Sequence, residues 1–237
     1  CALPICRITG ELVCGPETLT EEELVKNRED LWANVLTHPL DGPYYRERTG
    51  DLSKVTVPLL SAGNWGGSSL HLRGNIEGYL RAASTQKWLE IHGREHWTEF
   101  YTNYGVALQK RFFDHFLKGL DNGWDRQPRV MLRVRSVDDA FTDRAENEWP
   151  LARTQWTKFY LDAGDKSLKS APPAKAGTVE YDATGDGVTF SMPPLAADTE
   201  ITGPMMAKLF VSSSTKDADL FLIVRVFDPQ GRERSEE

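Results

Sequence analysis

Hydrophobic and polar positions change their period along the chain, and the densest pattern lies between Lys54 and Tyr101. Residues 55–61 form a continuous β-branched and apolar run, which predicts a strand buried on both faces. Residues 87–92 form a second short apolar-rich run and are followed by a glycine, so they predict another strand. Between the two runs, apolar side chains recur at helical spacing, at Ile76, Tyr79, Leu80 and Ala83.

This order of strand, helix and strand is typical of the parallel crossover unit. In parallel sheets the chemistry lies just beyond the carboxyl ends of the strands. Here those ends are residues 63–67, with the sequence GNWGG, and residues 93–97, with the sequence GREHW. Functional side chains are therefore expected in these two segments.

Helical patterns flank the central unit. Thr20 and Glu23 form a capping box, and apolar residues at helical spacing follow, so a helix is expected over residues 21–36. Downstream, Leu108, Phe112 and Phe116 recur every four residues, and Lys118-Gly119 supplies a stop signal. A second helix is expected over residues 104–118.

Beyond residue 121 the pattern changes to alternation, with turn clusters between short strand-like runs. The predicted strands contain Val130, Leu132, Val134; Phe159, Leu161; Val188, Phe190; Met206, Phe210; and Leu220 to Phe227. This spacing is typical of an antiparallel sandwich or jelly roll. The fold class is thus α/β plus all-β.

Composition excludes several classes of function. The 237 residues carry a net charge of −7 with interspersed charges, so nucleic-acid binding has no electrostatic support. No apolar run is long enough to span a membrane, and no signal-peptide pattern opens the chain. Three cysteines confined to residues 1–14 make a poor disulfide framework, which favours a reducing, cytoplasmic compartment but leaves one bridge open.

Several stretches resemble the CocE/NonD family, the cocaine-esterase and X-Pro dipeptidyl-peptidase-like α/β-hydrolases. They are HPLDGPYYRERTGDLSKVTVPLL, the glycine-rich turn at 63–67, RFFDHFLKG, NEWPLARTQWTKFYLD and TGPMMAKLFVSSSTKDADLFLIVRVFDPQG. The resemblance implies three parts: the end of a helical cap with its connection (1–50), the C-terminal part of a hydrolase core (51–125), and an incomplete jelly roll (126–237).

The resemblance also implies hydrolysis of a small ester or amide by a Ser-His-Asp triad, without a cofactor. His96 occupies the position of the family's catalytic histidine, whose imidazole accepts the serine proton and returns it to the leaving group. No G-x-S-x-G nucleophile motif occurs in the chain. The nucleophile is therefore expected in an upstream, N-terminal remainder of the same protein, and the fragment alone is expected to be inactive. A homo-oligomer is also left open.

The catalytic acid is unassigned. Relatives commonly carry aspartate two residues after the tryptophan of the first turn, and here Gly67 stands at that position. No carboxylate occurs between Lys54 and Glu77. Around this turn, Asn64, Trp65 and Trp97 are the expected pocket residues, although large aromatic side chains near a sheet edge are more often simple packing.

Two alternatives belong to other classes. The missing acid and nucleophile fit a non-catalytic β-sandwich binding module attached to a degenerate hydrolase fragment. Residues 92–96 also match the H-x-x-E-H pattern of zinc peptidases, which requires both histidines on one helical face. The glycine inside that pattern and the strand-like sequence before it oppose a zinc site, so no metal is expected.

Overall fold

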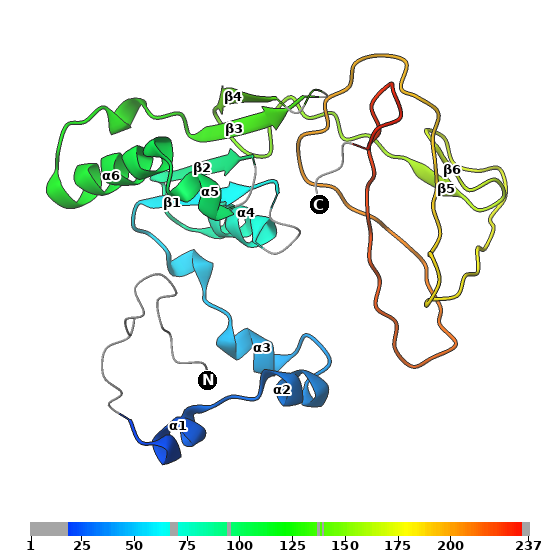
Figure 1. Cartoon of the computed structure of the whole chain (residues 1–237), viewed down its shortest axis with the longest axis horizontal. Helices are drawn as coiled ribbons and strands as arrows, with labels where there is room; N and C mark the ends of the chain where they lie inside the picture. The colour runs from blue at the N-terminus through cyan, green and yellow to red at the C-terminus, as the bar shows by residue number, and fades with distance from the viewer. Residues whose placement is uncertain (1–18, 67–70, 94–95, 137, 139, 234–237) are drawn as a thin grey trace. The chain divides into compact units, whose positions relative to one another are not determined.

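The computed structural model describes residues 19–66, 71–93, 96–136, 138 and 140–233, except for the side chain of His96. The chain divides into two compact units, residues 1–51 and 52–237 (Figure 1). The second unit contains the central strand-helix-strand region and therefore the predicted site.

Three short helices make up the described part of the first unit: α1 (Glu21–Asn27), α2 (Leu31–Thr37) and α3 (Pro43–Arg48). The predicted capping box is present, since the Thr20 side chain accepts from the backbone of Glu23 and the Glu23 carboxylate accepts from the backbone of Thr20. The single helix expected over 21–36 is wrong. The backbone is extended at Arg28, and Asp30 caps a new helix by accepting from the Ala33 amide.

The crossover unit predicted from the sequence is confirmed. A short 3-10 turn, η1 (Leu52–Lys54), precedes β1 (Leu59–Asn64), and α4 (Leu72–Arg81) then leads to β2 (Lys87–His92). The strands β1 and β2 pair in parallel along their whole length. The first strand begins later than residues 55–61 suggested, and Pro58, which cannot donate to a ladder, directly precedes it.

Two more strands complete a mixed four-stranded sheet of order β1-β2-β3-β4. The strand β3 (Val130–Arg135) pairs in parallel with β2, and β4 (Phe141–Glu146) pairs antiparallel with β3. Alternation at Val130, Leu132 and Val134 pointed to an all-β region, but this strand extends the sheet of the crossover unit. Its alternating burial shows why the sequence misleads, because only one of its faces is fully covered.

Each face of the sheet has its own hydrophobic core. On the face that α4 covers, the buried residues are Tyr79, Leu89, Ile91, Val130, Leu132, Trp149 and Leu151. On the other face, α6 (Asn103–Lys118) and the turn η2 (Trp124–Arg126) contribute to a second buried cluster of Trp88, Leu108, Phe112 and Trp124. The predicted stripe of α6 is thus confirmed, and its helix ends at Gly119 in the left-handed conformation. In α4 the prediction holds for Ile76 and Tyr79, whereas Leu80 is exposed.

The jelly roll is not confirmed. After the hairpin of β5 (Tyr160–Asp162) and β6 (Ser167–Lys169), the described residues form only two isolated bridges. Apolar side chains of the predicted strands stay exposed, at Met206, Phe210, Phe221 and Ile223. Alternation supplies one apolar face per strand, and that face needs a second sheet to cover it. In the part of the chain that is described, no helix is long and apolar enough to cross a bilayer.

Truncating Leu132 to alanine is expected to lower the free energy of unfolding by about 2–5 kcal/mol, because this side chain is fully buried and leaves a cavity. The matched control Leu117→Ala removes the same atoms from a side chain that is 77% exposed and should change stability by no more than about 0.5 kcal/mol. Urea unfolding followed by tryptophan fluorescence measures both. Equal losses of unfolding free energy in the two variants would contradict the burial of Leu132 in the core.

Candidate functional site

The carboxyl ends of β1 and β2 lie side by side, as the parallel pairing requires. Asn64 is the register partner of His92, and each is the last residue of its strand. Both side chains are buried, at 1% and 6% exposure. The end of the β1–β2 pair is therefore built from two buried polar residues.

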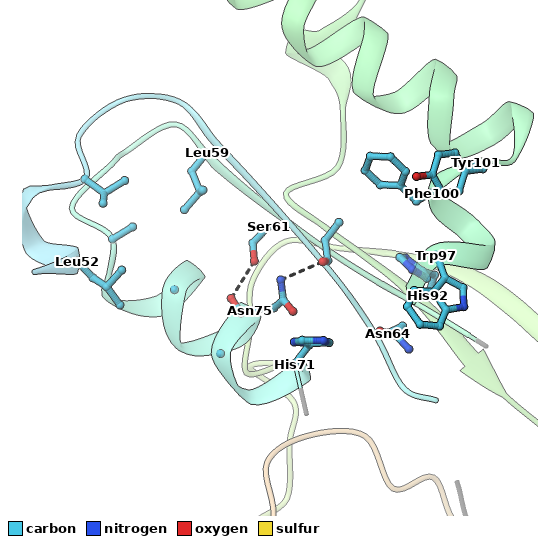
Figure 2. A pocket seen from close by; sticks show the side chains of 15 residues that line it. Leu52, Leu59, Ser61, Asn64, His71, Asn75, His92, Trp97, Phe100 and Tyr101 are labelled. Atoms are coloured by element: carbon cyan, nitrogen blue, oxygen red, sulfur yellow. Dashed lines mark hydrogen bonds between the residues drawn. The ribbon is translucent and has the colours of Figure 1, made fainter. Parts of the chain in front are cut away.

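Asn75 fixes α4 against β1. Its side-chain amide donates to the Ala62 carbonyl at 2.9 Å, and its own carbonyl accepts from the Ser61 hydroxyl at 2.8 Å (Figure 2). Gly63 allows this close approach, since a Cβ there would lie 3.2 Å from that of Asn75. The polar contacts set the position of the helix relative to the strand end.

A cavity of about 810 Å³ runs along the outer edge of β1, between α4 and the short helix α5 (His96–Phe100). Its lining includes Asn64, His71, Asn75, His92 and Trp97 (Figure 2). Aliphatic and aromatic side chains make up much of the remaining wall, at Leu52, Val55, Leu59, Phe100 and Tyr101. The β1 edge has no strand partner among the described residues.

The predicted site residues fall into three situations. Asn64 and Trp97 line the cavity, and Trp97 is 60% exposed there. Trp65 packs against the first core and donates its indole N–H to the Arg133 carbonyl at 2.7 Å. His96 is the first residue of α5, four positions after the last residue of β2, but its side chain lies outside the described atoms. Gly67, where relatives carry the acid, is also outside the described residues.

His92 is a cavity residue that the sequence analysis treated only as part of a zinc pattern. Neither of its ring nitrogens has a hydrogen-bond partner in the described part of the chain, and both are buried. Burial lowers the pKa of this imidazole, so the neutral form is favoured. Its place at the end of an apolar strand was the signal that could have drawn attention to it.

The geometry does not fit the zinc alternative. His92 ends a strand, whereas His96 begins a separate helix, so the two histidines are not four residues apart on one helix. The required arrangement of two ligands on a single helical face is therefore missing. No group of three or more metal-binding side chains was found among the described residues.

A second polar group lies beside His92 on the face that α6 covers. The Tyr104 hydroxyl donates to the Glu90 carboxylate at 3.1 Å, and burial raises the pKa of Glu90 to about 7. Burial also raises the pKa of Tyr104, which keeps the phenol protonated as a donor. Arg133 opposes the shift at Glu90, while the carboxylates of Glu99 and Asp143 reinforce it. A buried carboxyl whose pKa lies near 7 is more typical of a functional site than of a purely structural position.

The raised pKa of Glu90 predicts a pH-dependent stability. Between pH 4.5 and about 7 the folded protein holds a proton that the unfolded chain has released, so the free energy of unfolding falls as pH rises through this window. Glu90→Gln retains an acceptor for Tyr104 but cannot ionise. Relative to wild type, it should gain on the order of 2 kcal/mol between pH 5 and pH 8 in urea unfolding. Parallel pH curves for the two proteins would show that Glu90 is not held neutral.

Comparison with known proteins extends these observations. Residues 122–235 match the family described as the X-Pro dipeptidyl-peptidase C-terminal non-catalytic domain. Cocaine esterase from Rhodococcus sp. (strain MB1 Bresler) is 29% identical in an alignment of 166 positions, which covers 54% of this chain and 28% of the esterase.

Two solved structures of CocE/NonD family hydrolases are also similar to this chain. A CocE/NonD family hydrolase from Staphylococcus aureus matches with a TM-score of 0.64 at 34% identity, over 68% of this chain and 30% of the hydrolase. A second crystal structure of a CocE/NonD family hydrolase from that organism gives a TM-score of 0.57 at 36% identity, over 60% and 26% of the respective chains. The chain thus spans less than a third of the length of these relatives. The resemblance seen in the sequence is confirmed: the chain is similar to the CocE/NonD hydrolases, to cocaine esterase and to the C-terminal domain of the X-Pro dipeptidyl-peptidases.

Proposed function

We propose that this chain is the part of a serine hydrolase that supplies the catalytic histidine, and that the intact protein transfers an acyl group from an ester or amide to water. The observation that carries the proposal is the pair of adjacent parallel strand ends at Asn64 and His92, beside a partly apolar cavity, with His96 directly beyond. Relatives named as an esterase and as CocE/NonD hydrolases support the reaction class.

In this proposal His96 is the general base. Its imidazole removes the proton from a serine hydroxyl as the oxygen attacks the substrate carbonyl, and then protonates the leaving alcohol or amine. In the second half-reaction the imidazole removes a proton from water as the water attacks the acyl carbonyl, and returns that proton to the serine oxygen, which releases the acid. The carboxylate that would orient the imidazole stays unassigned, since Glu99, the buried carboxylate on α5, is already paired with Arg133.

The nucleophile is proposed to come from an upstream portion of the same protein. The outer edge of β1 supports this, because its backbone faces the 810 Å³ cavity rather than another strand in the described part of the chain. An unpaired strand edge is a ready template for a further strand. We propose that a strand of the upstream portion pairs there and brings the serine to the β1–β2 end of the sheet.

The remaining parts are proposals of the same kind. Residues 1–50 would complete a helical cap, residues 51–125 a hydrolase core, and residues 126–237 a jelly roll. The alternative is a non-catalytic β-sandwich binding module on a degenerate hydrolase fragment. The match of residues 122–235 to a non-catalytic domain favours that reading for the β region, though not for the crossover unit.

A fluorophosphonate probe tests the proposal on the intact protein with its upstream portion. We expect one serine of that portion to be labelled, and His96→Gln to slow labelling by at least about 10³-fold, because the general base is lost. The matched control His115→Gln changes a histidine on α6 that bonds the Leu120 carbonyl, and should label at the wild-type rate. Prior dialysis against a metal chelator should leave labelling unchanged.

A third variant separates the two neighbouring histidines. His92→Gln should slow labelling by less than about tenfold, since the proposal gives this side chain no proton-transfer step. Loss of labelling in His92→Gln with retention in His96→Gln would move the base to the end of β2. Complete absence of serine labelling in the wild-type protein would favour the binding-module alternative.

A further inference from the structure

Arg133 contacts both segments that follow the site strands. It lies on β3, and its backbone carbonyl accepts the indole N–H of Trp65 at 2.7 Å. Trp65 is the residue directly after β1, so this bond fixes the start of the first turn. Its partner atom belongs to a strand that is remote in sequence but only two positions away in the sheet.

The side chain of the same residue reaches the other segment. The Arg133 Nη1 atom lies 2.7 Å from Oε2 of Glu99, on the helix that His96 begins. The side chains are 23% and 10% exposed, so solvent screens this ion pair only weakly. One residue of β3 therefore joins the turn after β1 to the helix after β2.

The guanidinium has further contacts that limit its movement. Its Nε atom pairs with the Asp143 carboxylate of β4 at 2.9 Å, and its Cζ atom lies 5.0 Å from the ring centre of Tyr104 on α6. An arginine held by two carboxylates and an aromatic face has few alternative rotamers. This makes it a firm reference point for the two segments.

The helix α5, which begins at His96, needs such a reference point. With five residues, α5 is too short to be stable by itself, so tertiary contacts must determine its position. Its carboxyl end is packed tightly onto α6, since a Cβ on Gly105 would lie 2.1 Å from the Glu99 carbonyl oxygen. The Glu99 carbonyl also accepts from the hydroxyl of Thr102 at 2.8 Å. The side chain of the same residue ties this end of the helix to the sheet through its ion pair with Arg133.

We infer that Arg133 is a positioning residue for the proposed reaction, acting through Glu99 on the helix that carries His96. The inference rests on the proposed function. Catalysis is sensitive to such positioning, because a displacement of about 1 Å can reduce a rate by about 10²-fold. The cavity lining in the described part of the chain does not include Arg133, so its removal should affect the chemical step and leave substrate binding nearly unchanged.

The test uses the intact protein and a matched pair of variants. Arg133→Met removes the guanidinium while retaining most of the stem. The control Arg144→Met removes an arginine of the adjacent strand with almost the same burial (26% exposed) and an ion pair of the same length, 2.7 Å, to a carboxylate that is 10% exposed. The ion pairs of Arg144 in the described part of the chain go to Glu146 and Glu200, and neither carboxylate lies on α5.

We expect Arg133→Met to lower kcat for an ester by about 10–100-fold with KM changed less than about threefold, and to slow fluorophosphonate labelling equally. Arg144→Met should stay within about twofold of the wild-type values in both assays, even if its thermal midpoint falls as much as that of Arg133→Met. Glu99→Gln should reproduce the effect of Arg133→Met, and the double variant should be no slower than Arg133→Met, because the two side chains act as one unit.

The outcomes separate the two proposals. Should Arg133→Met fail to fold, the nearly isosteric Glu99→Gln decides alone. Wild-type labelling rates in Arg133→Met or Glu99→Gln, or equal kcat losses in the Arg144 control, would reduce Arg133 to a structural role and overturn the inference. In those cases the wild-type protein still labels, so the proposed function stands. A wild-type protein that never labels would overturn both.

Discussion

Parallel pairing of β1 with β2 is the constraint on which the rest of this structure depends. Its register places Asn64 beside His92 and sets the two following segments at one edge of the sheet. A slip of one residue would turn the apolar side chains of Leu89 and Ile91 away from the α4 core and expose the opposite set. The hydrophobic pattern of the strands therefore fixes the position of the polar residues at their ends.

Polar groups on the α6 side of β2 are costly in a buried sheet. Glu90 and His92 lie where a strand covered on both faces would ordinarily carry apolar residues. Tyr104 and Arg133 compensate Glu90 only in part, since the pKa of this carboxyl is raised to about 7. Departures of this kind tend to concentrate at functional sites. In this chain they lie on the strand that leads to His96.

Sequence patterns predicted the parts of the fold that local burial determines. The strand at residues 87–92, the capping box at Thr20 and the stripe of α6 are all present, because each depends on neighbours within one or two turns or on simple continuity of apolar residues. The start of β1 and the break after α1 were missed. Pro58 lacks the N–H that a strand ladder needs, and Asp30 accepts a single bond from the Ala33 amide, and hydrophobic periodicity reflects neither effect.

The candidate site was predictable in location but not in its contacts. Strand ends in a crossover unit can be found from the sequence, and they led to Asn64, Trp97 and His96. By contrast, Trp65 and Glu99 meet Arg133 across long sequence separations, which only the strand order β1-β2-β3 brings together. The strand-like runs beyond residue 170 show a different limit of sequence analysis. Alternation predicts a strand, but it does not identify the partner that must pair with that strand.

A crystal structure of the intact protein, covalently labelled by a fluorophosphonate, would show whether a serine and His96 meet at the carboxyl ends of β1 and β2. We expect a further strand paired in parallel with the edge of β1 that has no strand partner among the described residues, and a phosphonylated serine oxygen within about 2.6–3.2 Å of a His96 ring nitrogen. An edge of β1 that faces solvent, or a labelled serine remote from the carboxyl ends of β1 and β2, would contradict it.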